Sequence, residues 1–420
     1  MSVTITATRR ALHLVVALLA CTLAACTGTF EDGAPIVLLV ATGTDGAGGD
    51  AAIVGFLVEP PGPASPRSVT PLGTGDLAGD LDLPVRDWDW RDRAGVVGGP
   101  GAGRTQLTVL ASVSAAALDA RQARLHRYDV SAFETSTPTL TQLGAPLDLV
   151  VDGAWNADAI PVEDGFEPDD GVCLSALSVS GDGRYAALLD RRSDCQAGDA
   201  EVYLYVVDLE DARLVWASTP DDVAPTRAYI DQGADTIDIL IRRGQSRFDV
   251  YRSELEALQG PLGGTERFGE IEESQPLRDI AGAGDERWLL FDGWLRTLSD
   301  TGALGPRVAS ASGATRRLVP TDARLPTVVI GGNDLWVHAT PTSEGLTFAR
   351  RYLDGVTDVA DRLTYLVRPG AIDTLDLLVF TPERPIGESV STLYSDGDGG
   401  GRLAAPRLVT WFRPPLPPLP

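Results

Sequence analysis

Hydrophobic residues cluster in short runs that are separated by glycine, aspartate and proline. The runs have strand length and are rich in β-branched and aromatic residues. Examples are residues 36–40, 107–110, 202–207, 237–241, 288–291, 327–330 and 375–380. One stretch, residues 112–122 (SVSAAALDARQ), has a helical spacing, although a loop would also fit it. The pattern predicts an all-β chain.

The clearest repeating unit lies between Cys173 and Ser218. Its four expected strands are Leu174–Ser180, Tyr185–Arg191, Val202–Leu209 and Arg213–Ala217, with a tight turn at Gly181–Arg184. Four antiparallel strands in about 45 residues make one blade of a β-propeller. Similar turns of glycine and an acid begin at Gly233 and Gly284, 52 and 51 positions further on (233 − 181 and 284 − 233). The spacing indicates that the unit repeats.

Two motifs in this unit are similar to those of known propellers. Ser180-Gly181-Asp182-Gly183-Arg184-Tyr185 resembles the S-P-D-G-R-Y turn of WD40-like and TolB-like β-propellers, with Gly181 in place of proline. Val206-Val207-Asp208-Leu209, followed by Arg213-Leu214-Val215-Trp216, resembles the outer hairpin of the same repeats. The resemblance implies a fold and brings no function with it.

We expect a single propeller over residues 36–412, built from about seven four-stranded antiparallel blades. The units begin near residues 36, 81, 147, 226, 278, 316 and 356, and six or eight blades would also fit. The first unit lacks one strand and the last has a surplus one, Arg407–Phe412. Pairing between them would close the ring and remove an exposed edge. Residues 413–420 (RPPLPPLP) are expected to form an extended tail, because proline cannot donate to a sheet.

Residues 1–25 have the features of a secretory signal peptide. Arg9 and Arg10 precede a short apolar run centred on residues 14–20, and small residues follow. The run is too short for a spanning helix, which needs about 20 residues.

Leu23-Ala24-Ala25-Cys26 resembles the lipobox of bacterial lipoproteins. This resemblance implies that Cys26 becomes the lipidated first residue and that residues 26–35 form a tether. Two acyl chains are what stable anchoring takes. We therefore expect an exported lipoprotein, anchored in the cell envelope on the periplasmic or cell-surface side, with a monomeric body.

The formal charge of the chain is −24, and every basic side chain is arginine. Removing residues 1–25, which carry two arginines and no acid, would leave −26 (−24 − 2). Such a charge repels nucleic acid, so we expect no nucleic-acid partner.

Cys173 and Cys195 are the two cysteines that remain beyond Cys26. Outside the cytoplasm such a pair forms a disulfide. The bridge would close roughly 20 residues and contribute on the order of 3 kcal/mol. The alternative, a metal or redox pair, needs histidines or a C-x-x-C spacing, and the sequence has neither at this place.

Acidic segments are the candidates for calcium, the one cofactor that the sequence suggests. Residues 163–170 hold five carboxylates, among them Asp164, Asp169 and Asp170, while Asp396 and Asp398 flank a glycine. Calcium prefers several oxygen ligands on flexible loops. Neither segment has the spacing of an EF-hand, and solvated acidic loops would also account for them.

Trp88 and Trp90 alternate with acids in residues 87–92 (DWDWRD), which places both rings on one strand face. Aromatic rings beside acids could hold a sugar. Packing between blades is the other reading of the same pattern.

The sequence contains no evident catalytic constellation. His126 and His338 are the two histidines of the mature chain, and no G-x-S-x-G motif is present. We therefore expect a non-catalytic module that binds protein or glycan. The alternative is a propeller hydrolase or lyase acting on carbohydrate or a lactone, because a carboxylate pair is set by distance in space rather than by sequence.

Overall fold

The structure is a computed structural model. It describes residues 36–42, 52–59, 68–71, 81, 83, 85–92, 105–113, 121–131, 139–162, 171–191, 202–218, 225–231, 236–244, 246–258, 266–283, 286–291, 294–299, 301–309, 315–319, 327–332, 335–342, 345–347, 364–369, 374–381, 384–395 and 406–412. Twenty-nine strands dominate this part of the chain, and its helical content is one short 3-10 turn, Leu255–Ala257. The prediction of an all-β chain is confirmed.

Four of the sheets are separate and four-stranded. In sheet order they are β29 (Pro406–Phe412), β1 (Ile36–Thr42), β2 (Ala52–Glu59) and β3 (Ser68–Pro71); β10 (Leu174–Val179), β11 (Tyr185–Arg191), β12 (Val202–Asp208) and β13 (Arg213–Ala217); β14 (Pro225–Ile230), β15 (Thr236–Arg243), β16 (Arg247–Glu254) and β17 (Glu266–Glu272); β18 (Leu277–Ala283), β19 (Glu286–Phe291), β20 (Trp294–Ser299) and β21 (Val308–Ala309).

Two larger sheets complete the described fold. The six-stranded sheet contains β4 (Val85–Asp92), β5 (Thr105–Val113), β6 (Gln122–Ser131), β7 (Thr139–Gln142), β8 (Leu147–Val151) and β9 (Ala154–Trp155). The seven-stranded sheet contains β22 (Thr315–Val319), β23 (Thr327–Gly332), β24 (Leu335–Thr342), β25 (Gly345–Thr347), β26 (Thr364–Pro369), β27 (Thr374–Thr381) and β28 (Arg384–Ser395).

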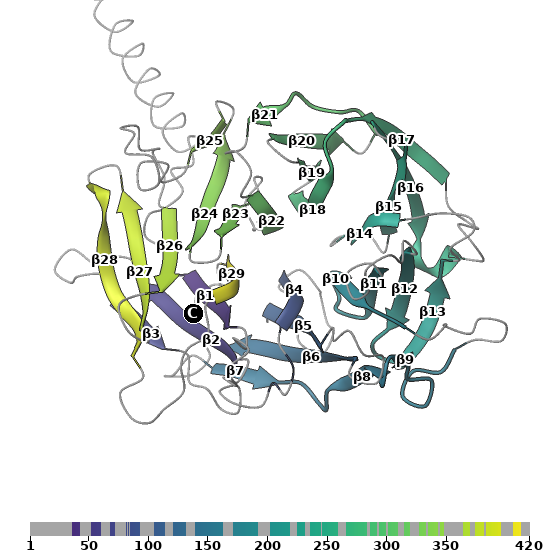
Figure 1. The fold of residues 1–420 in the computed structure, drawn as a ribbon, viewed down its shortest axis with the longest axis horizontal. Helices are drawn as coiled ribbons and strands as arrows, with labels where there is room; N and C mark the ends of the chain where they lie inside the picture. Colours follow the sequence, from purple (N-terminus) through teal and green to yellow (C-terminus); the bar gives the residue numbers. More distant parts are fainter. Residues whose placement is uncertain are drawn as a thin grey trace, which may run out of the picture.

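The six sheets stand around a common axis (Figure 1). The strand nearest the axis in each sheet is β29, β4, β10, β14, β18 or β22. This arrangement makes the chain a β-propeller. The expectation of seven separate blades is corrected, because the structure has four separate four-stranded blades and two composite sheets. The composite sheets arise because β6 pairs with both β7 and β8, and because two residue pairs join β24 to β26.

The unit expected to begin near residue 147 is also corrected. Its first strand, β8, pairs with β6, so it extends the preceding sheet instead of starting a blade. The helical-looking stretch 112–122 is no helix where it is described, since its two ends belong to β5 and β6.

The ring is closed by pairing between the first and the last strand of the chain. β29 pairs with β1 in antiparallel register, from Val37 opposite Phe412 to Thr42 opposite Pro406. The predicted pairing of the C-terminal strand with the first blade is confirmed. The pairing covers the edge of β1 that would otherwise be open.

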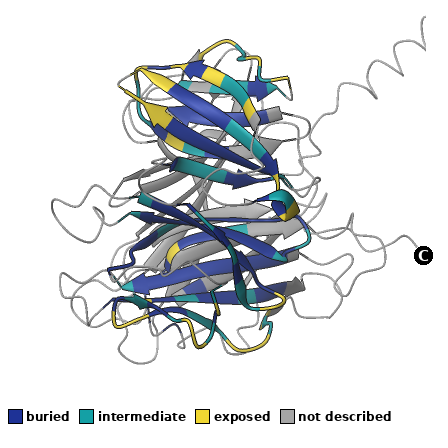
Figure 2. Ribbon diagram, turned by 90° about the vertical axis from the view of Figure 1, so that its right-hand side faces the viewer, coloured by how far each residue is buried: buried dark blue, intermediate teal, exposed yellow. Residues whose placement is uncertain are grey.

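The core lies between neighbouring sheets (Figure 2). Strands β11 and β12 are buried along almost their whole length, because each face of their sheet meets another sheet. This explains why residues 185–190 and 203–207 are largely apolar at successive positions rather than at alternate ones. Trp155, from the β8–β9 hairpin, enters the same core and contacts the ring of Tyr205 at 4.9 Å between centroids.

Candidate functional site

The turn between β10 and β11 is held by its own side chains. The hydroxyl of Ser180 accepts the Tyr185 N–H at 2.9 Å and donates to the carboxylate of Asp182 at 2.5 Å. Asp182 also accepts the Arg184 N–H at 2.9 Å. Gly183 has φ +75°, and a Cβ there would lie 2.3 Å from Oε1 of Gln106 on the neighbouring sheet. The positive φ is what favours glycine here, because the Gln106 side chain can move away from an added Cβ.

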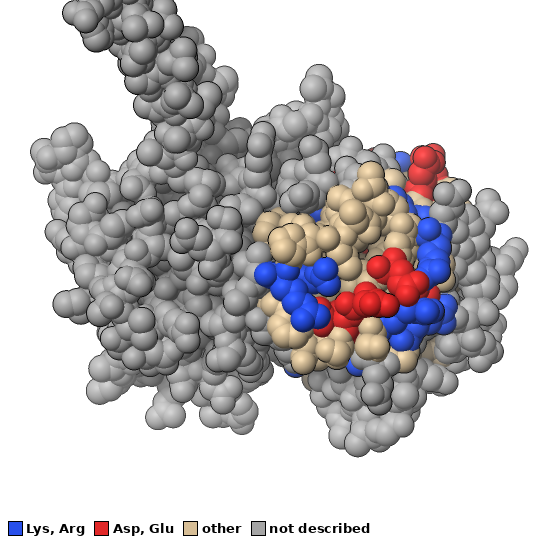
Figure 3. All heavy atoms as spheres, turned by 90° about the horizontal axis from the view of Figure 1, so that it is seen from above, with Lys and Arg blue, Asp and Glu red and all other residues tan. Residues whose placement is uncertain are grey.

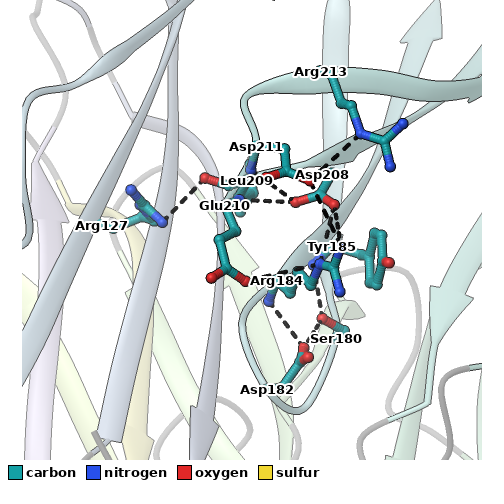
Figure 4. Close-up of polar contacts among 10 residues, drawn as sticks. All are labelled: Arg127, Ser180, Asp182, Arg184, Tyr185, Asp208, Leu209, Glu210, Asp211 and Arg213. Carbon is teal, nitrogen blue, oxygen red and sulfur yellow. Dashed lines mark hydrogen bonds and ion pairs between the residues drawn. The ribbon is translucent and has the colours of Figure 1, made fainter. Parts of the chain in front are cut away.

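Arg184 leaves this turn and binds Asp208, at the turn between β12 and β13 (Figure 4). Its Nε and Nη2 donate to Oδ2 of Asp208 at 3.0 and 2.8 Å. Oδ1 of Asp208 accepts the backbone N–H groups of Glu210 and Asp211 at 2.9 and 3.1 Å. These contacts join the two turns at one end of the blade.

The charges of this pair stabilise each other. The side-chain hydrogen bond to Asp208 raises the pKa of Arg184, against the effect of burial. Burial alone would raise the pKa of Asp208, but the hydrogen bonds from Arg184 and from the two backbone amides outweigh it and lower that pKa. Asp208 is fully buried, while the side chain of Arg184 is 35% exposed. The pair therefore connects the two turns at the surface of the blade.

We expect Asp208→Asn to destabilise the fold by about 1–2 kcal/mol at pH 7, a value reduced by the partial exposure of Arg184. The lowered pKa means that Asp208 stabilises the fold above its unfolded value of 3.8, and that this contribution is lost as pH falls through the folded pKa. Urea titrations at pH 7 and near pH 3 measure both values. Asp211→Asn, which removes a 56% exposed acid from the same turn, should have little effect at either pH. Equal losses at both pH values would contradict the proposed role of the charge.

Acidic side chains of β4 bind the next sheet. Oδ2 of Asp87 accepts the Leu177 N–H at 2.8 Å, and Oδ2 of Asp89 accepts the Val179 N–H at 2.9 Å. Both amides belong to β10, the innermost strand of its blade. The two carboxylates therefore satisfy backbone groups that the inner edge of a sheet leaves without a ladder partner.

A buried ionic cluster joins the blade of β14–β17 to that of β18–β21. Nε of Arg287 donates to Asp238 at 2.8 Å, and its Nη2 contacts Asp231. Asp238 also accepts from Arg252 at 2.7 and 3.0 Å. Arg287 and Asp238 are 4% and 1% exposed, so these charges hold blades together rather than face solvent.

Arginine and acidic side chains are interspersed on the outer surface as well (Figure 3). Three exposed arginines surround the buried carboxylate of Asp249, with Arg243, Arg247 and Arg267 at 3.3, 3.7 and 2.8 Å. Hydrogen bonds to Tyr251 and Asp249 raise the pKa of Arg243. Such pairs at the surface contribute little stability each.

Cys173 is the one predicted disulfide residue that the structure describes. It is buried and disulfide-bonded, and its N–H donates to the fully buried carboxylate of Asp190 at 2.7 Å. Tyr205 donates to the other oxygen of Asp190 at 3.2 Å. Cys195 lies outside the described residues, so its pairing with Cys173 stays a prediction.

The other predicted site residues divide into two groups. Trp88 is 3% exposed, and its ring is packed inside the fold rather than open to a sugar. The side chain of Trp90 is outside the described part, as are Cys26 and the calcium candidates Asp164, Asp169, Asp170, Asp396 and Asp398. The predictions for these residues are untested.

The described histidine side chain is also internal. His126 is 3% exposed and stacks with Tyr128, with 6.1 Å between the ring centroids. Burial raises the pKa of Tyr128 to about 12. Within the described ranges, no three His, Cys, Asp or Glu side chains lie close enough together to hold a metal ion. The same ranges contain no helix that is long and apolar enough to cross a membrane.

Comparisons with known proteins give distant likenesses only. No family model matches the chain, and no curated protein matches it. Solved structures with a similar arrangement include a putative 6-phosphogluconolactonase from Bacteroides uniformis, at 12% identity and a TM-score of 0.45, covering 90% of this chain and 99% of that one. The periplasmic gluconolactonase of Pseudomonas aeruginosa is 16% identical, with a TM-score of 0.49 and coverage of 91% and 100%.

The WD40 repeats of RRP9 are 8% identical, with a TM-score of 0.39, and cover 71% of this chain and 76% of that one. Likenesses at this level carry no argument about activity. The propeller assignment rests on the sheet topology described above.

Proposed function

We propose that the chain is a lipoprotein of the bacterial cell envelope, tethered through Cys26, whose propeller is a non-catalytic module that binds protein or glycan. The observation that carries the proposal is the use of the buried carboxylates. Asp208, Asp238 and Glu273 are each held by arginine. Asp87 is held by backbone amides. These acids stiffen the turns and join the blades, which suits a rigid platform.

Glu273 illustrates this use. Its side chain is 0% exposed and accepts the indole N–H of Trp294 at 2.8 Å and the Ser274 N–H at 2.9 Å. Arg307 lies 3.3 Å away and covers the ring of Trp294. An acid–base catalyst needs a carboxylate that can exchange protons with a substrate. Glu273 instead ties β20 and the segment beyond it to the end of β17.

Seven blades are part of the same proposal. The seven-stranded sheet divides into β22–β25 and β26–β28 at the short contact between β24 and β26, which consists of two residue pairs. The six described sheets become seven proposed units if the largest sheet is divided there. The pairing of Cys173 with Cys195 and the anchoring of the body by one lipid complete the proposal.

The proposal is tested in cells and with purified protein. Cys26→Ser should move the protein from the membrane fraction to the soluble fraction, because the acyl chains are its anchor. Crosslinking of the tethered protein should then recover a specific envelope protein or glycan, and the Cys26→Ser variant should recover less of it. The purified protein should not turn over a panel of glycans and sugar lactones. Turnover without a recoverable partner would overturn the binding function, and an unchanged membrane fraction would overturn the anchor.

A further inference from the structure

Two polar side chains lie between the sheet of β4–β9 and the blade of β10–β13 without the partners that their chemistry favours. Gln106 belongs to β5, and Arg127 belongs to the neighbouring strand β6. In the pairing of these strands Gln106 stands opposite Asp129, two positions beyond Arg127. The two side chains are therefore diagonal neighbours on one face of the sheet, about 7–8 Å apart at their Cα atoms.

That face is turned toward the blade of β10–β13. Leu125, two residues before Arg127, lies on it and belongs to a hydrophobic cluster that the sheet shares with this blade. Further along the face, Gln106 and Arg127 meet two turns of the blade. Oε1 of Gln106 lies beside Gly183, and Nη1 of Arg127 donates to the carbonyl of Leu209 at 3.4 Å (Figure 4). We call the two polar side chains and these two turns the seam site.

Gln106 contributes a buried acceptor to the seam site. The residue is 5% exposed, and its Oε1 has no hydrogen-bond partner in the part of the chain that the structure describes. Burying an amide oxygen without a hydrogen bond destabilises a fold, so native proteins rarely keep such a group. A role in binding is one reason for keeping it.

Arg127 contributes a half-buried positive charge. Arg184 donates to a carboxylate at 2.8 Å, whereas Arg127, among the described residues, makes one long hydrogen bond to a carbonyl group and no ion pair. Burial lowers the pKa of Arg127, because the guanidinium loses water and gains no carboxylate in return. The acids of the facing turn, Asp208 and Glu210, pair with Arg184 instead. Asp129, on the same face as Arg127, makes other contacts.

We propose that the seam site binds a hydroxycarboxylate, the grouping found in sugar acids, with its carboxylate on Arg127 and its hydroxyl on Gln106. This inference rests on the proposed binding function and names its ligand class. A guanidinium group has five N–H donors and binds a carboxylate through two of them, so the bond to Leu209 leaves enough donors for the ligand. The amide oxygen of Gln106 accepts the hydroxyl proton. Arg127 is less buried than Gln106, so the charged end of the ligand lies nearer to solvent.

The test measures the binding of three small probes to the full chain in detergent by calorimetry. D-galacturonate has both groups, D-galactose lacks the carboxylate, and acetate lacks the hydroxyl. D-galacturonate should bind at least about tenfold more tightly than either of the others. Arg127→Met should lower the affinity for D-galacturonate by at least about tenfold, and Gln106→Leu by about fivefold.

Urea unfolding of the same variants separates binding from a structural role. Arg127→Met removes a partly desolvated charge that has no acid, and Gln106→Leu removes a buried oxygen that has no donor. Both variants should therefore unfold at the urea concentration of the wild type or above it. A lower unfolding concentration for both would assign the two side chains a structural role and overturn the inference.

The matched control is Gln142→Leu/Arg242→Met, which removes an amide and a guanidinium from β7 and β15. It should keep the wild-type affinity within about twofold. The inference fails if D-galacturonate does not bind, if D-galactose or acetate binds equally, or if control and seam variants lose the same affinity. Crosslinking distinguishes this failure from that of the proposed function. A partner recovered equally with wild type and with Gln106→Leu/Arg127→Met would leave the binding function intact and refute the seam site.

Discussion

Removal of residues 406–420 is expected to lower the melting temperature by at least about 10 °C or to abolish cooperative unfolding. The deletion removes β29, and with it the six residue pairs that join the end of the chain to β1. Strand β1 would then present unpaired backbone groups at an open edge, which favours aggregation. Circular dichroism and calorimetry on the truncated chain measure the effect.

Deletion of residues 413–420 is the control, because it removes the proline-rich end and keeps β29. It should unfold as the full chain does. A peptide with the sequence of residues 406–412 should restore part of the lost stability when added to the truncated chain, by adding a strand to β1. Equal stability of the two truncated chains would refute the role of β29 in closing the ring.

Arg287→Met is expected to destabilise the protein by about 3 kcal/mol, because it leaves the buried carboxylate of Asp238 with one arginine instead of two. The same change removes the contact with Asp231 and thus the ionic link between two blades. Urea unfolding monitored by tryptophan fluorescence measures the loss. Arg242→Met, at an exposed position of β15, should cost less than about 0.5 kcal/mol.

A double-mutant cycle separates this charge pair from general packing. If Arg287 and Asp238 interact as the geometry indicates, Arg287→Met and Asp238→Asn together should cost less than the sum of the two single changes. The double variant no longer buries the charge of either member of the pair. Additive losses would show that the two side chains stabilise the fold independently.

Local signals in the sequence were sufficient for the blade of β10–β13. Strands β11 and β13 begin and end at the predicted residues, and β10 and β12 end one residue earlier. Glycine and aspartate mark the turns, and continuous apolar runs mark strands that are covered on both faces. Local signals do not show which strands pair with one another. The residues of β8 form a plausible first strand, and nothing in them shows that β6 is their partner.

The ionic contacts could not be predicted from the sequence for a similar reason. Arg184 and Asp208 are 24 positions apart, and Arg287 and Asp238 are 49 apart. Which of the many arginines and acids meet depends on how the blades stack. Trp88 shows the same limit, because an alternating pattern does not distinguish a packed strand face from an open one, and Trp88 is buried.

One repeated signal at the starts of the innermost strands is present in the sequence. Pro84-Val85-Arg86-Asp87 and Pro276-Leu277-Arg278-Asp279 share the pattern Pro-x-Arg-Asp, and Pro225-Thr226-Arg227 shares its first three positions. In the two Pro-x-Arg-Asp segments the strand begins at the residue after proline, arginine is the extra residue, and aspartate accepts a backbone N–H. A search for repeats at strand starts, rather than at turns, would have found this pattern.

The closure of the ring also sets the order in which the protein can fold. Val37 pairs with Phe412, which lies 375 positions later in the chain (412 − 37). During synthesis β1 emerges among the first strands and its inner partner among the last, so the first blade must wait for nearly the whole chain to be made. Contacts so distant in sequence form slowly, and chains with unpaired edges aggregate or recruit chaperones. A nascent chain that ends before residue 406 should therefore bind holding chaperones, and release should coincide with the appearance of β29.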